Sequence, residues 1–122
     1  MNGVLLLREI GGGSSGGSVS PASWTNIGPT APGTGIGWNN VVTLTATGTA
    51  SLTATPTGGG NLFYNLNGVI KPYSGPFAVT NGDTLSWGEQ NTTGSTVSGS
   101  VTVTQGMTAI GSFSYIVRVA GP

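Results

Sequence analysis

Few side chains in this chain could carry acid–base or nucleophilic chemistry. The sequence has no histidine and no cysteine, so a Ser-His-Asp triad, a Cys-His pair and an ordinary zinc or haem site all lack essential residues. The chain has three basic and three acidic residues, namely Arg8, Glu9, Lys71, Asp83, Glu89 and Arg118. Any acid–base chemistry would therefore depend on the three carboxyl groups.

Those carboxyl groups are not spaced for catalysis. Glycoside hydrolysis needs two carboxyl groups about 5–9.5 Å apart. Asp83 and Glu89 are expected in one strand, which would place them about 20 Å apart, and Glu9 belongs to a separate N-terminal segment. We expect no enzyme activity, no metal site and no cofactor.

Three shorter motifs have structural explanations. Asn81-Gly-Asp83 is typical of a turn whose carboxylate accepts backbone hydrogen bonds; a calcium site is the alternative, but Ca²⁺ takes about 6–8 oxygen ligands. The glycine runs at 11–17 and 58–60 lack the Lys-Ser/Thr and the helix of a phosphate-binding loop. Asn91-Thr-Thr93 matches a glycosylation sequon, which we interpret as a chance match.

The low charge restricts the classes of partner. Charged residues make up 5% of the chain and the net charge is zero, against about 25% charged residues in ordinary domains. Neither nucleic acid nor an anionic membrane is therefore an expected partner, and no apolar stretch approaches the roughly 20 residues of a membrane span. Because 36% of the residues are hydrophobic, a folded domain is favoured over disorder. A surface with so little charge promotes association.

The sequence divides into three parts. Residues 1–18 comprise an apolar arm, 1–10, and a Gly/Ser linker, 11–18, that is either native or engineered. Residues 19–37 are rich in proline and glycine and are expected to be an extended lead-in segment. Residues 38–122 are expected to form the domain.

Alternation of apolar and polar residues indicates strands in the third part. Asn67-Gly68 between two apolar runs is a strong hairpin signal. We predict an all-β fold, an antiparallel immunoglobulin-like β-sandwich of about seven to eight strands with an extended N-terminal arm. The predicted core is Val42, Leu44, Leu52, Leu62, Tyr64, Leu66, Phe77, Leu85, Trp87, Val101, Val103, Phe113, Tyr115 and Val117.

Three aromatic residues lie outside the clear alternating pattern. Trp24, Trp38 and Tyr73 are expected in loops or at strand edges. They could stack on a host glycan or another surface, although burial is the favoured interpretation.

Part of the sequence resembles a known class of modules. The motifs are Leu62-Phe-Tyr-Asn-Leu-Asn-Gly68, Tyr73-Ser-Gly-Pro-Phe77, Val79-Thr-Asn-Gly-Asp-Thr-Leu85 and Val101-Thr-Val-Thr-Gln-Gly106. Together they are similar to immunoglobulin-like modules of tailed-bacteriophage structural proteins, over about residues 40–119. The resemblance implies a virion protein assembled in the bacterial host cytoplasm, and it carries no catalytic residues over. A chain with an extracellular type of composition and no recognisable export signal suits that location.

The arm provides the sharpest functional hypothesis. Its aliphatic residues are expected to dock on a neighbouring virion protein, a major capsid or tail protein, either as an added strand or as a short helix; they are Val4, Leu5, Leu6, Leu7 and Ile10. The alternative is that the arm adds a strand to its own sandwich. We expect a multicopy or homo-oligomeric capsid decoration (cement) protein, with a tail or baseplate accessory domain, a glycan- or receptor-binding module and an adhesin fragment as alternatives.

Overall fold

The chain folds into a β-sandwich without helices in the part that is described. The structure, a computed structural model, describes residues 17–31 and 35–118. Its strands are β1 (Ser18–Val19), β2 (Ile36–Trp38), β3 (Val42–Thr43), β4 (Ala46–Thr47), β5 (Ala50–Pro56), β6 (Asn61–Leu66), β7 (Val69–Pro72), β8 (Phe77–Val79), β9 (Thr84–Gln90), β10 (Val97–Gln105) and β11 (Thr108–Val117). The all-β, antiparallel prediction is confirmed. The described residues form more strands than the seven to eight expected, because they include three short strands of two residues each, β1, β3 and β4.

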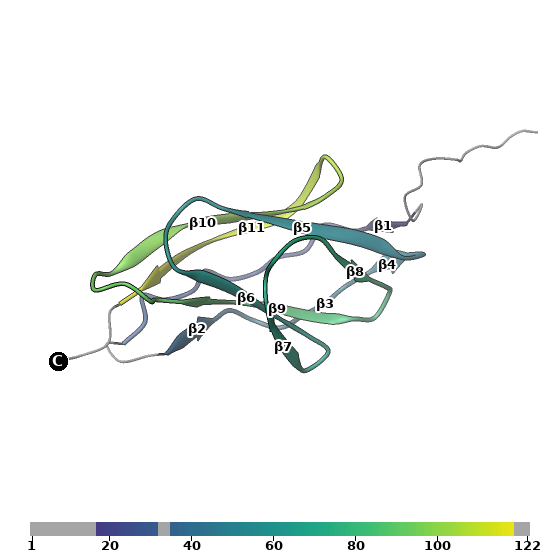
Figure 1. Ribbon diagram of the computed structural model, residues 1–122. Helices are drawn as coiled ribbons and strands as arrows, with labels where there is room; N and C mark the ends of the chain where they lie inside the picture. The colour runs from purple at the N-terminus through teal and green to yellow at the C-terminus, as the bar shows by residue number, and fades with distance from the viewer. Residues whose placement is uncertain (1–16, 32–34, 119–122) are drawn as a thin grey trace, which may run out of the picture.

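Two sheets form the layers of the sandwich. One has the order β11-β10-β5-β8, and the other has the order β2-β9-β6-β7, with β3 also paired to β9. Figure 1 shows β5, β10 and β11 above β6, β9 and β2. All strand pairs within the sheets are antiparallel.

The turns follow from local sequence. Asn67 and Gly68 both have positive φ, 56° and 88°, as the tight turn between β6 and β7 requires. Gly82, with φ 90°, allows the turn that precedes β9. Both turns are where the sequence placed them.

Residues 17–31 belong to the sandwich instead of merely leading into it. β1 pairs with β4 in a small two-stranded sheet. Farther along, Ile27 forms a parallel bridge with Tyr115, and its N–H donates to the Ser114 carbonyl at 2.9 Å. This stretch covers the edge of β11 that would otherwise be free. The boundaries proposed at 18/19 and 37/38 therefore cut through β1 and β2, because Ser18 and Ile36–Gly37 are already paired.

The core lies between the sheets and is centred on Trp87, which is 0% exposed. Its ring lies about 6 Å, between centroids, from the rings of Trp24, Tyr64, Tyr73, Phe77 and Phe113. Most of the predicted core is buried, but Val42, Leu66 and Phe77 are only partly buried at its margin. The buried hydrophobic residues outside that predicted core are Val19, Trp24, Ile27, Ala50, Ala54, Val79, Val97 and Ile110.

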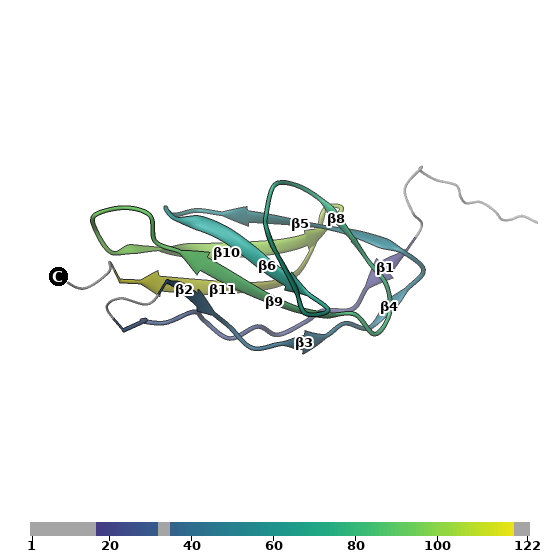
Figure 2. The same cartoon turned by 60° about the horizontal axis from the view of Figure 1, so that its bottom comes forward.

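The sandwich is elongated, and the described chain begins and ends at opposite poles. Ser18 pairs with Thr47, beside the turn between β4 and β5, so Gly17 lies at that pole. Figures 1 and 2 show β11 ending at the other pole. We call these the N-terminal pole and the C-terminal pole. Among residues 17–31 and 35–118, no helix is long and apolar enough to cross a membrane.

Candidate functional site

The aliphatic arm residues, Val4 to Leu7 and Ile10, lie outside the described residues. The structure does describe the point where that segment joins the domain. The Gln105 side chain donates to the Gly17 carbonyl at 2.9 Å and accepts a hydrogen bond from the Val19 N–H at 3.2 Å. Ser18 and Thr47 are linked through their hydroxyls at 2.8 Å. The domain therefore holds its first described residues firmly at the N-terminal pole.

Trp24 is a core residue and offers no surface for a glycan. Its side chain is 6% exposed, and its indole Nε1–H donates to the Leu85 carbonyl at 3.0 Å. The ring meets Trp87 edge to face, with 6.0 Å between centroids. Of the two interpretations of Trp24, burial is the one that the structure supports.

Trp38 and Tyr73 are half-buried and lie on opposite faces of one sheet. Trp38 stands directly opposite Gly88, and its ring covers the place where a Cβ on Gly88 would lie. Since side chains alternate along β9, Trp38 is on the outer face, away from Trp87. Tyr73 is on the inner side, in ring contact with Trp87 and Phe77, and its hydroxyl accepts the Ala54 N–H at 2.9 Å. The fold therefore does not bring these aromatic residues into one sugar-binding platform.

Asp83 has the structural role expected of its turn. Its carboxylate accepts the Thr80 N–H at 2.9 Å and the Asn67 side-chain amide at 3.0 Å. Asn67 also accepts the Thr84 N–H at 2.9 Å. The hydrogen bond from Asn67, followed by that from the Thr80 backbone, lowers the pKa of Asp83 below its ordinary value. The carboxylate thus joins the two turns at the N-terminal pole.

Glu89 is the chemically unusual residue that the sequence did not reveal. Its side chain is 1% exposed and lies between the two sheets, near the C-terminal pole. Its Oε2 has no hydrogen-bond partner, and a Cβ on Gly60 would lie only 2.5 Å from its Oε1. Because side chains alternate along a strand, the sequence places Glu89 on the same face as Leu85 and Trp87. That alternation is the signal in the sequence that indicates its burial.

Burial changes the ionisation of Glu89. Loss of hydration raises its pKa from 4.5 to about 7, because an ionised carboxylate is costly in an apolar interior. Tyr115 lies beside it, and its hydroxyl donates to the Gly59 carbonyl at 3.0 Å. Burial, and then the charge of Glu89, raise the pKa of Tyr115 as well.

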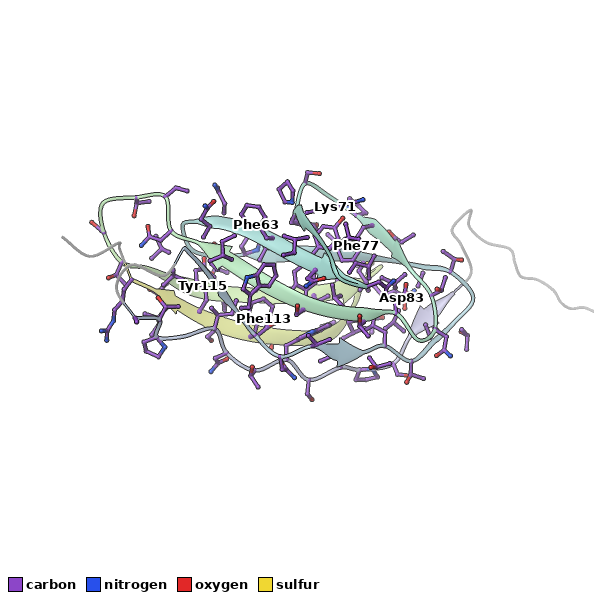
Figure 3. The ribbon with its side chains drawn as sticks, turned by 90° about the horizontal axis from the view of Figure 1, so that it is seen from below. Phe63, Lys71, Phe77, Asp83, Phe113 and Tyr115 are labelled. Carbon is purple, nitrogen blue, oxygen red and sulfur yellow. The ribbon has the colours of Figure 1, made fainter. Side chains whose placement is uncertain are left out.

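The arrangement around Glu89 does not amount to an active site. A carboxyl group with a pKa near neutrality can exchange protons at physiological pH. However, a side chain that is 1% exposed is not reached by a substrate in this conformation. Within the described ranges, no group of three or more metal-ligating side chains comes together. Figure 3 shows Asp83 toward one pole and Tyr115, the neighbour of Glu89, toward the other.

The β7 edge is an exposed apolar feature of the described surface. All four residues of β7 are exposed, and Val69 and Ile70 are each 54% exposed. Beside β7 lies a groove of about 250 Å³ lined by Tyr64, Leu66, Asn67, Val69 and Lys71. Pockets for drug-sized ligands are about 300–1,000 Å³, so the groove suits an aliphatic side chain better than a small-molecule ligand.

Comparison with known proteins identifies no family. No family model and no curated protein matches the chain. Among solved structures, it is similar to the N-terminal domain of PorA, with a TM-score of 0.36 and 11% sequence identity over 84% of this chain and 90% of that one. A similarity this low carries no argument about function.

Proposed function

We propose that this chain is a non-enzymatic structural protein of a tailed-bacteriophage virion. In this proposal it is a multicopy capsid decoration protein, held to a neighbouring virion protein by residues 4–10. The resemblance of residues 40–119 to phage immunoglobulin-like modules supports the virion location. The geometry of the domain supports the mode of attachment.

The observation that carries the proposal is the way the chain enters the sandwich. β1 runs antiparallel to β4, with Ser18 opposite Thr47 and Val19 opposite Ala46, so the chain passes inward from the N-terminal pole. Gly17, to which residues 1–16 are joined, therefore lies at the N-terminal pole. Residues 17–31 supply Val19, Trp24 and Ile27 to the buried core of the described domain. An aliphatic segment joined to the domain at its pole through a Gly/Ser linker is suited to binding another molecule.

The outer face of the β11-β10-β5-β8 sheet suits a crowded assembly. Cross-strand partners on this face are small hydroxyl residues, with Thr102 opposite Ser112 and Thr55, and Ser100 opposite Ser114. None of these side chains is charged, so neighbouring copies would not repel one another. On a symmetric particle, weak contacts between many copies add up through multivalency.

The proposal that the chain is not an enzyme rests on the separation of its acidic groups. Asp83 directly precedes β9 and Glu89 is near its end, about 20 Å away along an extended strand. One carboxylate is engaged by Asn67 and Thr80, and the other is enclosed. Neither is placed to act on a shared substrate.

Deleting residues 1–16 tests the proposal. The cut must precede Gly17, because Gly17 and Ser18 are bonded to Gln105 and Thr47. The truncated protein should keep the circular dichroism spectrum and unfolding midpoint of the full chain, yet be absent from purified particles when its copies are counted by mass spectrometry. Incorporation of the truncated protein at the level of the full chain would refute attachment by the arm.

A further inference from the structure

β7 is a free sheet edge, and its hydrogen bonds to β6 determine which of its backbone groups face the free side. It is the last strand in the order β2-β9-β6-β7, and its described neighbour is β6 alone. The Tyr73 N–H donates to the Leu62 carbonyl at 2.8 Å. Since hydrogen-bonded and non-hydrogen-bonded pairs alternate along an antiparallel ladder, Lys71 and Val69 also bond toward β6. The N–H and C=O of Ile70 therefore face the free side.

The side chains of β7 offer an added strand further contacts beside those of the backbone. Val69 is opposite Leu66, and Lys71 is opposite Tyr64, so both β7 residues line the groove on the inner side. Ile70 projects to the outer side and is 54% exposed. A strand added here would find aliphatic contacts on both of its faces.

Lys71 is a cation without an acidic partner in the described part of the chain. Asp83 is bonded to Asn67 and Thr80, and Glu89 is buried in the core. The remaining acidic residue of the sequence is Glu9, which directly follows the aliphatic arm residues and Arg8. An arm lying along β7 could place Glu9 near Lys71.

The point where residues 1–16 join the domain lies at the same pole as the start of β7. Asn81 accepts the Ala46 N–H at 2.9 Å, which places the Asp83 turn beside β4, and β4 pairs with β1. The Asn67-Gly68 turn is bonded to that same turn, so β7 begins at the N-terminal pole. Residues 1–16 are joined to Gly17 at that same pole, and a chain of this length can reach at most about 55 Å. This length is enough to meet the β7 edge of an adjacent molecule.

We propose that the β7 edge of a second copy of this chain receives the arm, with residues 4–9 as an added antiparallel strand and an aliphatic side chain in the groove beside Val69. This inference rests on the proposed function and specifies the neighbour that the arm contacts. Pro72 lacks an N–H, so it limits the ladder to the Ile70 region and leaves much of the contact to side chains. Copies linked in this way, each by one arm and one β7 edge, would form rows or closed rings on a particle.

Disulfide trapping tests the inference in a chain that has no native cysteine. Full-length V69C would be mixed with isotope-labelled L6C, and separately with labelled L5C, because neighbouring residues of a strand point to opposite faces. After mild oxidation, the yield of disulfide-linked heterodimers is measured by mass spectrometry. For one of the two arm residues, this yield should be about 100-fold higher with V69C than with a control cysteine away from the edge, since docking raises the effective concentration. The control is M107C, because Met107 is 102% exposed at the turn between β10 and β11.

The outcomes separate this inference from the proposed function. Heterodimers at the control level would overturn docking on β7. A monomer with an internal disulfide in an L6C/V69C or L5C/V69C double variant, without intermolecular trapping, would overturn it in favour of the arm covering its own edge. If residues 1–16 are nevertheless required for incorporation into particles, the arm binds a different virion protein, and the proposed function stands without this inference.

Discussion

The indole nitrogen of Trp24 donates a hydrogen bond of 3.0 Å to the carbonyl of Leu85, in the interior of the sandwich. Leu85 is in the central strand β9, where it is 0% exposed. The bond therefore ties the segment before β2 to the middle of the opposite sheet. Residues 17–31 are part of the folding unit for this reason, and a truncation aimed at the arm must spare them.

Replacing Trp24 should show how much that segment contributes. Trp24→Phe leaves the Leu85 carbonyl without its donor and should lower the free energy of unfolding by about 1–3 kcal/mol. Trp24→Ala also leaves a cavity and should cost about 3–5 kcal/mol. Urea unfolding at a constant m-value measures both effects. A cost for Trp24→Ala within experimental error would show that the segment is peripheral to stability.

Gly111 provides an independent test of the same packing. A Cβ at this position would lie 2.7 Å from the Trp24 ring and 2.7 Å from the Ala22 carbonyl. Gly111→Ala should therefore destabilise the domain by about 1–3 kcal/mol, as overpacking does. Gly94→Ala is the matched control, because nothing lies within 4 Å of its added Cβ. Equal unfolding midpoints for the two variants would contradict the packing described here.

The stability of the protein should depend on pH through Glu89. Its pKa is about 7 when folded, against 4.5 ordinarily, so between those values the folded state binds more protons than the unfolded state. The contribution of Glu89 to the free energy of unfolding should consequently be largest below about pH 4.5 and fall as the pH rises to about 7. At 1.36 kcal/mol per pKa unit, the total fall is on the order of 3 kcal/mol.

The substitution Glu89→Gln should remove most of this pH dependence, because an amide does not ionise. The chain has no histidine to titrate in the same range, so urea unfolding at a series of pH values should isolate the effect. Asp83→Asn, which leaves Glu89 intact, should keep it. A Glu89→Gln profile that slopes as steeply as that of the unmodified protein would locate the titration elsewhere.

Asp83 should have the opposite pH dependence in a lower range. Its pKa is lowered from 3.8 by Asn67 and Thr80, so its stabilising effect is present above that value and is lost as the pH falls through the lower, folded-state pKa. Asn67→Gly keeps the positive φ accessible but removes the amide that bonds Asp83. It should lower the free energy of unfolding by about 0.5–1.5 kcal/mol at neutral pH. In an Asn67/Asp83 double-mutant cycle, strictly additive effects would argue against this hydrogen bond.

Local sequence rules were sufficient for much of the fold. Alternation identified the strands around Leu62 and Phe113, and the Asn67-Gly68 and Asn81-Gly-Asp83 turns are as predicted. Turn chemistry depends on a few adjacent residues, so it can be recognised without knowledge of the rest of the chain. The predicted hydrogen bonding of a backbone N–H to the Asp83 carboxylate is also confirmed, by the bond from Thr80.

The features that the sequence did not predict depend on long-range contacts. Ile27 is separated in sequence from its partner Tyr115, and no alternating pattern marks residues 19–31. Glu89 has the correct phase for burial, but the groups that enclose it, Tyr115 and the glycines of the 58–60 turn, are brought to it only in the folded chain. The core residues Ala50 and Val79 likewise depend on the pairing of β5 with β8, in which they are directly opposite one another.

A density map of the assembled particle is the most direct test of attachment through the arm. The account predicts residues 4–10 of each copy in contact with a neighbouring molecule, beyond the N-terminal pole of their own domain. Density that instead places those residues against their own sandwich, with the domain held to the particle by some other surface, would contradict it.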